Sequence, residues 1–84
     1  MKRRQLTFLT RSGCGLCAEA LPRVTQSARW LRVGVDVVDI ATDSTLEAEY
    51  HIRIPVVLNR RGRVVAEGRI SQLDALKAVV SAGF

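Results

Sequence analysis

The sequence predicts one α/β domain with the element order β-α-β-α-β-β-α, and three observations carry this prediction. Segments rich in β-branched residues alternate with segments whose apolar residues recur every three or four positions. The first strand, helix and second strand follow one another closely, which favours parallel pairing through a right-handed crossover. The last two strands flank a short segment containing Gly62, which is typical of a β-hairpin. The 84 residues are enough for one domain over 1–84 but not for two.

Residues 5–10 predict the first strand, because they are rich in β-forming residues and end before Ser12-Gly13. The next segment predicts a helix, because its apolar residues are spaced alternately by four and three positions and form one stripe. Pro22 lies inside this helix and removes one backbone hydrogen bond, so we expect a kink near it. Trp30 is expected to pack at the end of the helix. The stripe expected to face the core consists of Cys17, Leu21, Val24, Ala28 and Leu31.

Residues 33–40 predict the second strand, because they are β-branched and largely alternate between apolar and polar side chains. Asp43 or Ser44 is expected to cap a short helix, which Ile54-Pro55 ends. The valine-rich segments on either side of residues 59–63 predict the hairpin.

Ser71 is expected to cap the last helix, with Gly83 near the end of that helix. Hydrophobic residues make up 48% of the chain, which is enough for a core that needs no metal. The side chains of the last helix that are expected to face this core are Leu73, Leu76, Val79 and Val80.

The chain is basic, with 13 Lys and Arg against 8 Asp and Glu and a net charge of +5, which favours partners with acidic surfaces. The basic residues are scattered, and the arginines at residues 60–63 have no aromatic neighbours, so no nucleic-acid partner is expected. Residues 1–4 resemble the charged start of a signal peptide, but the apolar segment after them is short and is broken by Thr7 and Thr10. No apolar run approaches the length of a membrane span. We therefore expect a cytoplasmic monomer with no membrane partner.

Both cysteines of the protein, Cys14 and Cys17, lie at the junction between the first strand and the first helix. A helix N-terminus carries unpaired N–H groups and a partial positive charge, which stabilise a thiolate and lower its pKa. Cys14 is expected to lie exposed in the loop, with Cys17 one turn into the helix behind it and close enough to form a disulfide. Such a pair is what dithiol–disulfide exchange requires.

Two other interpretations of the cysteine pair leave redox chemistry aside. A structural disulfide closing so small a ring would add at most ~2 kcal/mol of stability, and reducing compartments disfavour it. A zinc site needs four ligands, and His51 is the only other soft candidate, so zinc would require a site shared by two chains. His51 itself is expected to be a surface residue at a helix end. We therefore expect no metal ligands in the monomer.

The element order, the Cys14-Gly15-Leu16-Cys17 motif and the Ile54-Pro55-Val56 segment ahead of a hairpin together resemble the thioredoxin fold. Within that fold the chain is most similar to small glutaredoxin-like proteins, and the resemblance covers nearly the whole chain. It implies a four-stranded mixed sheet flanked by three helices. It also implies a thiol–disulfide oxidoreductase that reduces protein or glutathione mixed disulfides.

The resemblance assigns roles to individual residues. Cys14 would be the attacking thiolate and Cys17 the resolving thiol. Pro55 would be the cis-proline that packs beside the cysteines, and the backbone of Ile54 would pair, strand-like, with an incoming peptide or glutathione. Arg11 matches a basic residue that contacts a glutathione carboxylate, and a cation there would favour the Cys14 thiolate.

The glutathione-binding turn of glutaredoxins resembles the segment around Gly68, and Arg53 beside the Ile54-Pro55 loop is expected to bind substrate. The chain also departs from the glutaredoxin pattern. Gly15-Leu16 stands where Pro-Tyr is common, and Arg53 stands where Thr is usual. Glu67 and Arg69 flank Gly68, where a second Gly and an Asp are more typical.

The implied chemistry needs no bound cofactor, only an external thiol reductant, either glutathione or a thioredoxin-reductase-type system. The expected partners are disulfide-containing proteins with acidic surfaces, and glutathione. Two alternatives belong to other classes. One is a non-catalytic thioredoxin-fold module that binds a partner through the Ile54-Pro55 groove. The other is a carrier of Cu(I), a soft ion that suits two cysteine ligands.

Overall fold

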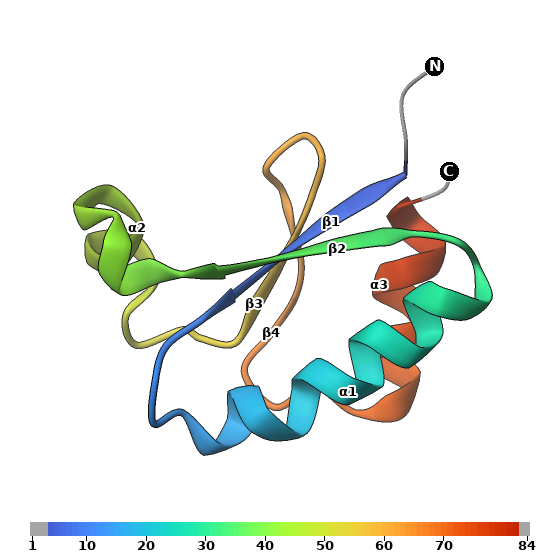
Figure 1. Ribbon diagram of the computed structural model, residues 1–84, viewed down its shortest axis with the longest axis horizontal. Coiled ribbons are helices and arrows are strands. Elements are labelled where there is room, and N and C mark those ends of the chain that lie inside the picture. The colour runs from blue at the N-terminus through green and yellow to red at the C-terminus, as the bar shows by residue number, and fades with distance from the viewer. Residues whose placement is uncertain (1–3, 83–84) are drawn as a thin grey trace.

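Four strands form one mixed sheet in the order β2-β1-β3-β4 (Figure 1), and the computed structural model describes residues 4–82. β1 (Gln5–Thr10) pairs in parallel with β2 (Gly34–Asp39), as the strand–helix–strand unit predicts. β1 pairs antiparallel with β3 (Val56–Asn59), which forms the predicted hairpin with β4 (Val64–Glu67). The predicted thioredoxin-like fold and its mixed sheet are confirmed. Gly83 and residues 1–3, which include Lys2 and Arg3, lie outside the described part of the chain.

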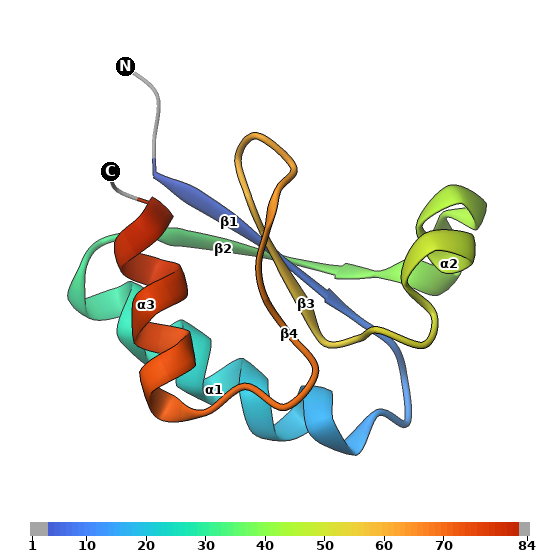
Figure 2. The same cartoon turned by 180° about the vertical axis from the view of Figure 1, so that it is seen from behind.

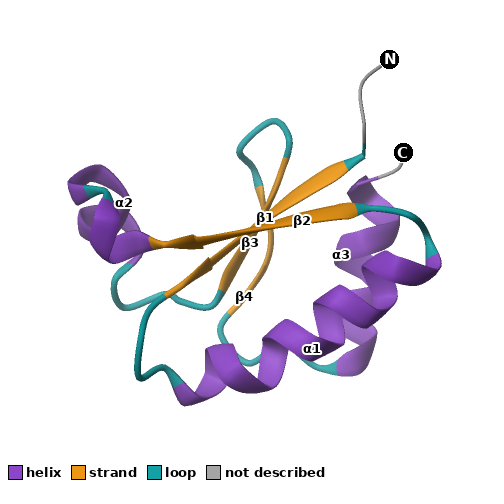
Figure 3. Ribbon diagram, viewed as in Figure 1, coloured by secondary structure: helices purple, strands orange, loops and turns teal. Residues whose placement is uncertain are grey.

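The three helices cover the sheet unequally. α1 (Gly15–Trp30) and α3 (Gln72–Ala82) pack against each other on one side of the sheet, as both views show (Figures 1 and 2). α2 (Ser44–Tyr50) lies apart from them, beyond the end of β2 and a 3₁₀ turn, η1 (Ile40–Thr42), and Figure 3 shows this separation most clearly. Among residues 4–82, no helix is both long and apolar enough to cross a membrane.

Successive residues of the central strands serve two different parts of the core, because side chains alternate between the faces of a sheet. Phe8 and Val57, which are paired across the sheet, pack beneath α1 and α3. Leu9 and Val56, the next pair, pack with Ile40 on the other face. Partly buried side chains from β2, α2 and the loop after α2 cover this second cluster, namely Val38, Leu46, Tyr50 and Ile54.

The buried face of α3 differs from the predicted one. Leu73, Leu76 and Val80 are 59%, 44% and 41% exposed, so their predicted inward orientation is wrong, although Val79 is buried as expected. The other buried side chains of α3 are Ala75 and Ala78. Small side chains let two helices approach each other closely. The buried side chains of α1 in the same cluster are also small, namely Ala20, Val24 and Ala28.

The predicted packing of Trp30 is also wrong, because its side chain is 87% exposed. Trp30 is the last residue of α1 and lies roughly 200° around the helix axis from buried Ala28. The predicted stripe is otherwise largely correct, with Cys17, Val24 and Ala28 buried and the remaining two side chains partly buried. α1 continues through Pro22, and the kink there stays a prediction.

Polar side chains cap the two later helices at predicted positions. The Oδ1 atom of Asp43 accepts the N–H groups of Thr45 and Leu46, at 2.9 and 3.2 Å, so Asp43 rather than Ser44 caps α2. Ser71 Oγ accepts the Asp74 N–H at 3.0 Å, and Asp74 accepts the Ser71 N–H at 3.1 Å. The Ser71 N–H, and to a smaller extent the Ser71 hydroxyl, hold the pKa of the Asp74 carboxyl below its ordinary value.

The small interface between α1 and α3 makes a testable prediction. Ala78→Leu should lower the free energy of unfolding by about 1–3 kcal/mol, because the close-packed interface has no room for three more carbon atoms. Leu76→Ala on the exposed flank should cost less than about 1 kcal/mol. Urea denaturation of both variants gives the two values, and a larger cost for Leu76→Ala would contradict this description of the interface.

Candidate active site

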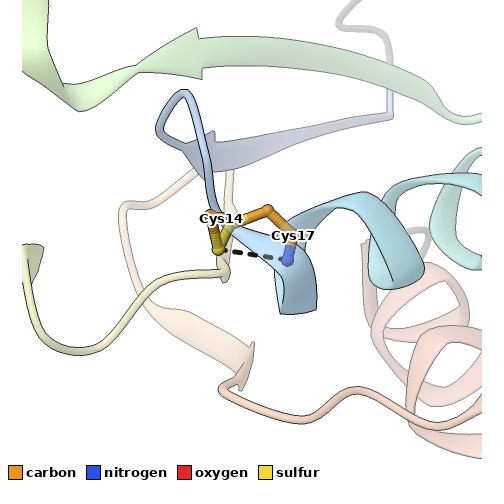
Figure 4. The surroundings of a disulfide bond; sticks show 2 residues. All are labelled: Cys14 and Cys17. Atoms are coloured by element: carbon orange, nitrogen blue, oxygen red, sulfur yellow. Dashed lines mark hydrogen bonds between the residues drawn. A yellow bond between two sulfur atoms is a disulfide. The ribbon is translucent and has the colours of Figure 1, made fainter.

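Cys14 and Cys17 form a disulfide at the start of α1 (Figure 4), with their Cα atoms 5.2 Å apart. Cys14 is the N-cap residue and has extended backbone angles, and its Sγ accepts the N–H of Cys17 at 3.1 Å. Cys17 is 3% exposed, as predicted, whereas Cys14 is partly buried rather than fully exposed. Cys14 is therefore the more accessible of the two residues, and it lies at the positive end of the helix.

The loop that holds Cys14 follows from the local sequence. After β1 ends at Thr10, the chain turns through Gly13, whose φ of +84° is a conformation that glycine adopts without strain. The Cys14 N–H donates to the carbonyl of Arg11 at 3.3 Å, and the Cys14 carbonyl accepts the N–H of Ala18 at 3.1 Å. Cys14 is thus held on both sides by backbone hydrogen bonds.

The Ile54–Pro55 peptide bond is cis, and Pro55 is fully buried. Ile54 packs against the cluster that contains Cys17 and that Cys14 also touches. In Figure 4 the pale yellow chain leading into β3 passes behind the disulfide. The Ile54 N–H already donates to the Tyr50 carbonyl at 3.2 Å, while no donor within residues 4–82 reaches the Ile54 carbonyl. The strand-like pairing of Ile54 with a substrate stays a prediction, and its carbonyl is the atom available for it.

Gly68 lies beside Pro55, because its N–H donates to the Pro55 carbonyl at 2.8 Å. Its φ of +71° lies in the left-handed region that favours glycine, and the space that a Cβ would occupy is open. The structure therefore brings together the loop before β3 and the turn after β4. The role of Gly68 in binding glutathione stays a prediction.

Arg11 connects the cysteine loop to α2, a contact that the sequence did not indicate. Its Nη1 lies 2.7 Å from Oε1 of Glu47, 36 residues further along the chain. The other Glu47 oxygen, Oε2, is buried and has no hydrogen-bond partner within the described residues. Glu47 lies on a helix too short to show a clear periodic pattern, so only the fold reveals that it faces Arg11.

Arg53 is held in a second cluster of charges. Its Nε and Nη2 donate to the two oxygens of Glu67 at 3.1 and 3.3 Å, and its Nη1 donates to Glu49 at 3.3 Å. Its guanidinium also lies 5.0 Å from the centre of the Tyr50 ring. The hydrogen bonds with Glu67 raise the pKa of Arg53, and they lower the pKa of Glu67. Arg53 and Glu67, two of the departures from the glutaredoxin pattern, are thus partners in one bidentate ion pair.

Metal-ligating side chains do not gather elsewhere in the described region. Within residues 4–82 no group of three or more His, Cys, Asp or Glu side chains is arranged to hold a metal ion. His51 follows α2, and its Nδ1 lies 3.1 Å from the Glu47 carbonyl, which agrees with its predicted place at a helix end.

A family model described as "Glutaredoxin-like domain (DUF836)" matches residues 5–78. The chain belongs to this glutaredoxin-like family. The match covers every described strand and most of α3, so the resemblance inferred from the cysteine motif and the Ile54-Pro55 segment is confirmed. No curated protein matches the chain.

Three solved structures share the fold of this glutaredoxin-like chain. The X-ray structure of target protein XcR50 from X. campestris is 31% identical, with a TM-score of 0.70, over 92% of this chain and 96% of that one. The solution structure of protein Ne2328 from Nitrosomonas europaea is 22% identical, with a TM-score of 0.68, over 80% of each chain. Thioredoxin 1 from Thermosipho africanus shares the fold at 14% identity, with a TM-score of 0.67, over 92% of this chain and 91% of its own.

The capping geometry predicts an acidic thiol at Cys14 in the reduced protein. In a Cys17→Ser variant, the N–H of residue 17 remains and should stabilise the Cys14 thiolate. The rate of alkylation by iodoacetamide, measured against pH, should have its midpoint below the value of about 8.5 for free cysteine. A Cys14→Ser variant serves as the control, because buried Cys17 should react slowly. A Cys14 midpoint at or above the free value would show that the helix N-terminus does not activate this thiol.

Proposed function

We propose that the protein is a thiol–disulfide oxidoreductase in which Cys14 attacks and Cys17 resolves. The observation that carries this proposal is the position of Cys14 Sγ at the N-cap of α1, where it accepts the Cys17 N–H, with Cys17 buried behind it. An N-cap acceptor gains stability as it becomes negatively charged, so the same hydrogen bond favours the nucleophilic form of Cys14.

The reaction has two exchange steps. The Cys14 thiolate attacks one sulfur of a substrate disulfide, which forms a mixed disulfide and releases the other sulfur as a thiolate. The Cys17 thiol loses its proton to solvent and attacks Cys14 Sγ, which releases the second substrate thiolate and leaves the Cys14–Cys17 disulfide. Two electrons pass from the cysteine pair to the substrate. An external thiol reductant then regenerates the pair, and no bound cofactor takes part.

The surroundings of the pair support binding of an extended chain. Ile54, whose carbonyl has no donor within the described residues, packs against the cluster that holds the cysteines, and the turn at Gly68 is hydrogen-bonded to Pro55. A substrate backbone N–H can donate to the Ile54 carbonyl, as an added strand does at the edge of a sheet. The charge of +5 favours substrates with acidic surfaces. The proposal includes a monomer acting in the cytoplasm, where thiols keep such a pair cycling.

The unequal positions of the two sulfurs predict unequal variants. A Cys14→Ser protein should lose almost all exchange with a disulfide substrate, because the buried Cys17 cannot reach it. A Cys17→Ser protein should still attack and should then accumulate as a mixed disulfide on Cys14. Mass spectrometry of each variant after incubation with a disulfide-containing protein measures the adducts.

The same experiment tests the alternatives. Equal trapping on both variants, or on neither, would contradict the division of roles and return the pair to a structural or metal-binding role. Turnover of the Cys17→Ser protein on glutathionylated substrates would show that glutathione resolves the adduct. A stalled adduct in the presence of glutathione would instead favour a cycle that needs both cysteines.

A further inference from the structure

The arginine of the cysteine loop, Arg11, and the arginine before Ile54, Arg53, both form ion pairs with glutamates. Arg11 lies three residues before Cys14, and its carbonyl accepts the Cys14 N–H, yet its guanidinium pairs with Glu47 at 2.7 Å. Arg53 directly precedes Ile54 at the proposed substrate groove, and its guanidinium pairs with Glu67 and Glu49. Neither cation presents an unpartnered charge to an incoming ligand.

The side chains in these ion pairs carry a charge opposite in sign to that of the whole chain. Two arginines meet three glutamates, so these five side chains together carry −1, whereas the chain carries +5. An anionic ligand gains little from arginines that glutamates already neutralise. It must also displace a carboxylate that the fold holds in place, such as the bidentate Glu67.

We propose that Glu47 and Glu67 determine specificity by making the Cys14–Cys17 site discriminate against anionic low-molecular-weight thiols. The inference rests on the proposed function and concerns the reductant. A neutral or dithiol reductant is favoured over one that carries carboxylates or a sulfonate. Glu47 and Glu67 act through Arg11 and Arg53, so they are positioning residues rather than catalytic ones.

The step in question is reduction of the oxidised pair. A thiolate attacks Cys14 Sγ, forms a mixed disulfide and displaces Cys17 as a thiolate. A second thiolate attacks the added sulfur, forms the oxidised reductant and releases the Cys14 thiolate, so that two electrons enter the protein. In the first attack, the reductant approaches the loop that carries Arg11, because the Arg11 carbonyl accepts the Cys14 N–H. A further negative charge that reaches the Arg11 side chain meets the Arg11–Glu47 pair in place of a single cation.

The experiment compares two small thiols of similar size, anionic 2-mercaptoethanesulfonate and neutral 2-mercaptoethanol, as reductants of the oxidised protein. Glu47→Gln should raise the rate constant for the anionic thiol roughly 2- to 5-fold, the range expected when an exposed ion pair of this kind is released. The rate constant for the neutral thiol should rise less, because its attacking thiolate carries no second negative charge, and its continued reaction also shows that the variant is folded. Glu47→Gln should be tolerated, because Oε2 of Glu47 has no partner to lose within the described residues.

A charge control and a double variant distinguish the effect of breaking the ion pair from the effect of removing one negative charge anywhere in the protein. Asp36 is exposed on β2 and makes no ion pair within the described residues, so Asp36→Asn removes one negative charge elsewhere and should leave both rate constants unchanged. The gain from Glu47→Gln should vanish when Arg11→Gln is added. Glu67→Gln should likewise favour the anionic thiol, and its gain should vanish with Arg53→Gln. High salt should reduce each gain, because exposed charges are screened.

The outcomes distinguish this inference from the proposed function. If the oxidised protein reacts with both thiols but Glu47→Gln and Glu67→Gln change the two rate constants equally, the inference is overturned and the redox function stands. A gain that persists without Arg11 also overturns it. If the oxidised protein reacts with neither thiol, both proposals fail.

Discussion

The hydrogen bond from the Cys17 N–H to Cys14 Sγ depends on the residue at which α1 begins. The loop before α1 and the packing of α1 against the sheet and α3 together determine that residue. Gly13 ends the loop after β1, and the buried stripe of α1 holds the helix against the sheet and α3. A helix that began one turn later would leave both sulfurs in a loop, without the N–H donors that favour a thiolate. The packing beneath α1 therefore also fixes the position of the hydrogen bond to Cys14 at the first turn of the helix.

The other side of the site is assembled differently. α2 contributes no fully buried side chain, and partly buried Leu46 and Tyr50 are its contacts with the second cluster of the core. Ion pairs connect it to the cysteine loop through Arg11 and to the loop before β3 through Arg53. Exposed pairs contribute little to stability, and the effect proposed for these two is on the charge that a ligand meets. The site thus has an apolar side packed into the core and a charged side on a helix with no fully buried side chain.

The order of the elements and their approximate bounds could be predicted from the sequence, because periodicity, caps and turn residues are local signals. Asp43, Ser71 and Gly62 each act within a few residues of their own position. The buried face of α3 could not be predicted in this way. Its leucines and its alanines lie on different sides of the helix, and hydrophobicity alone favours the leucines. The choice of the alanines follows from how closely α1 approaches.

By itself the sequence determined the cysteine pair at a strand-to-helix junction, the proline before a hairpin and the family to which these features belong. These features depend on residues close together in the chain or on a motif with fixed spacing. The tertiary structure decided which groups surround the pair, because an arginine finds its glutamate only when separated elements meet. Glu47 lies 36 residues from Arg11, and Glu67 lies 14 residues from Arg53, at distances along the chain where no local pattern reports a contact.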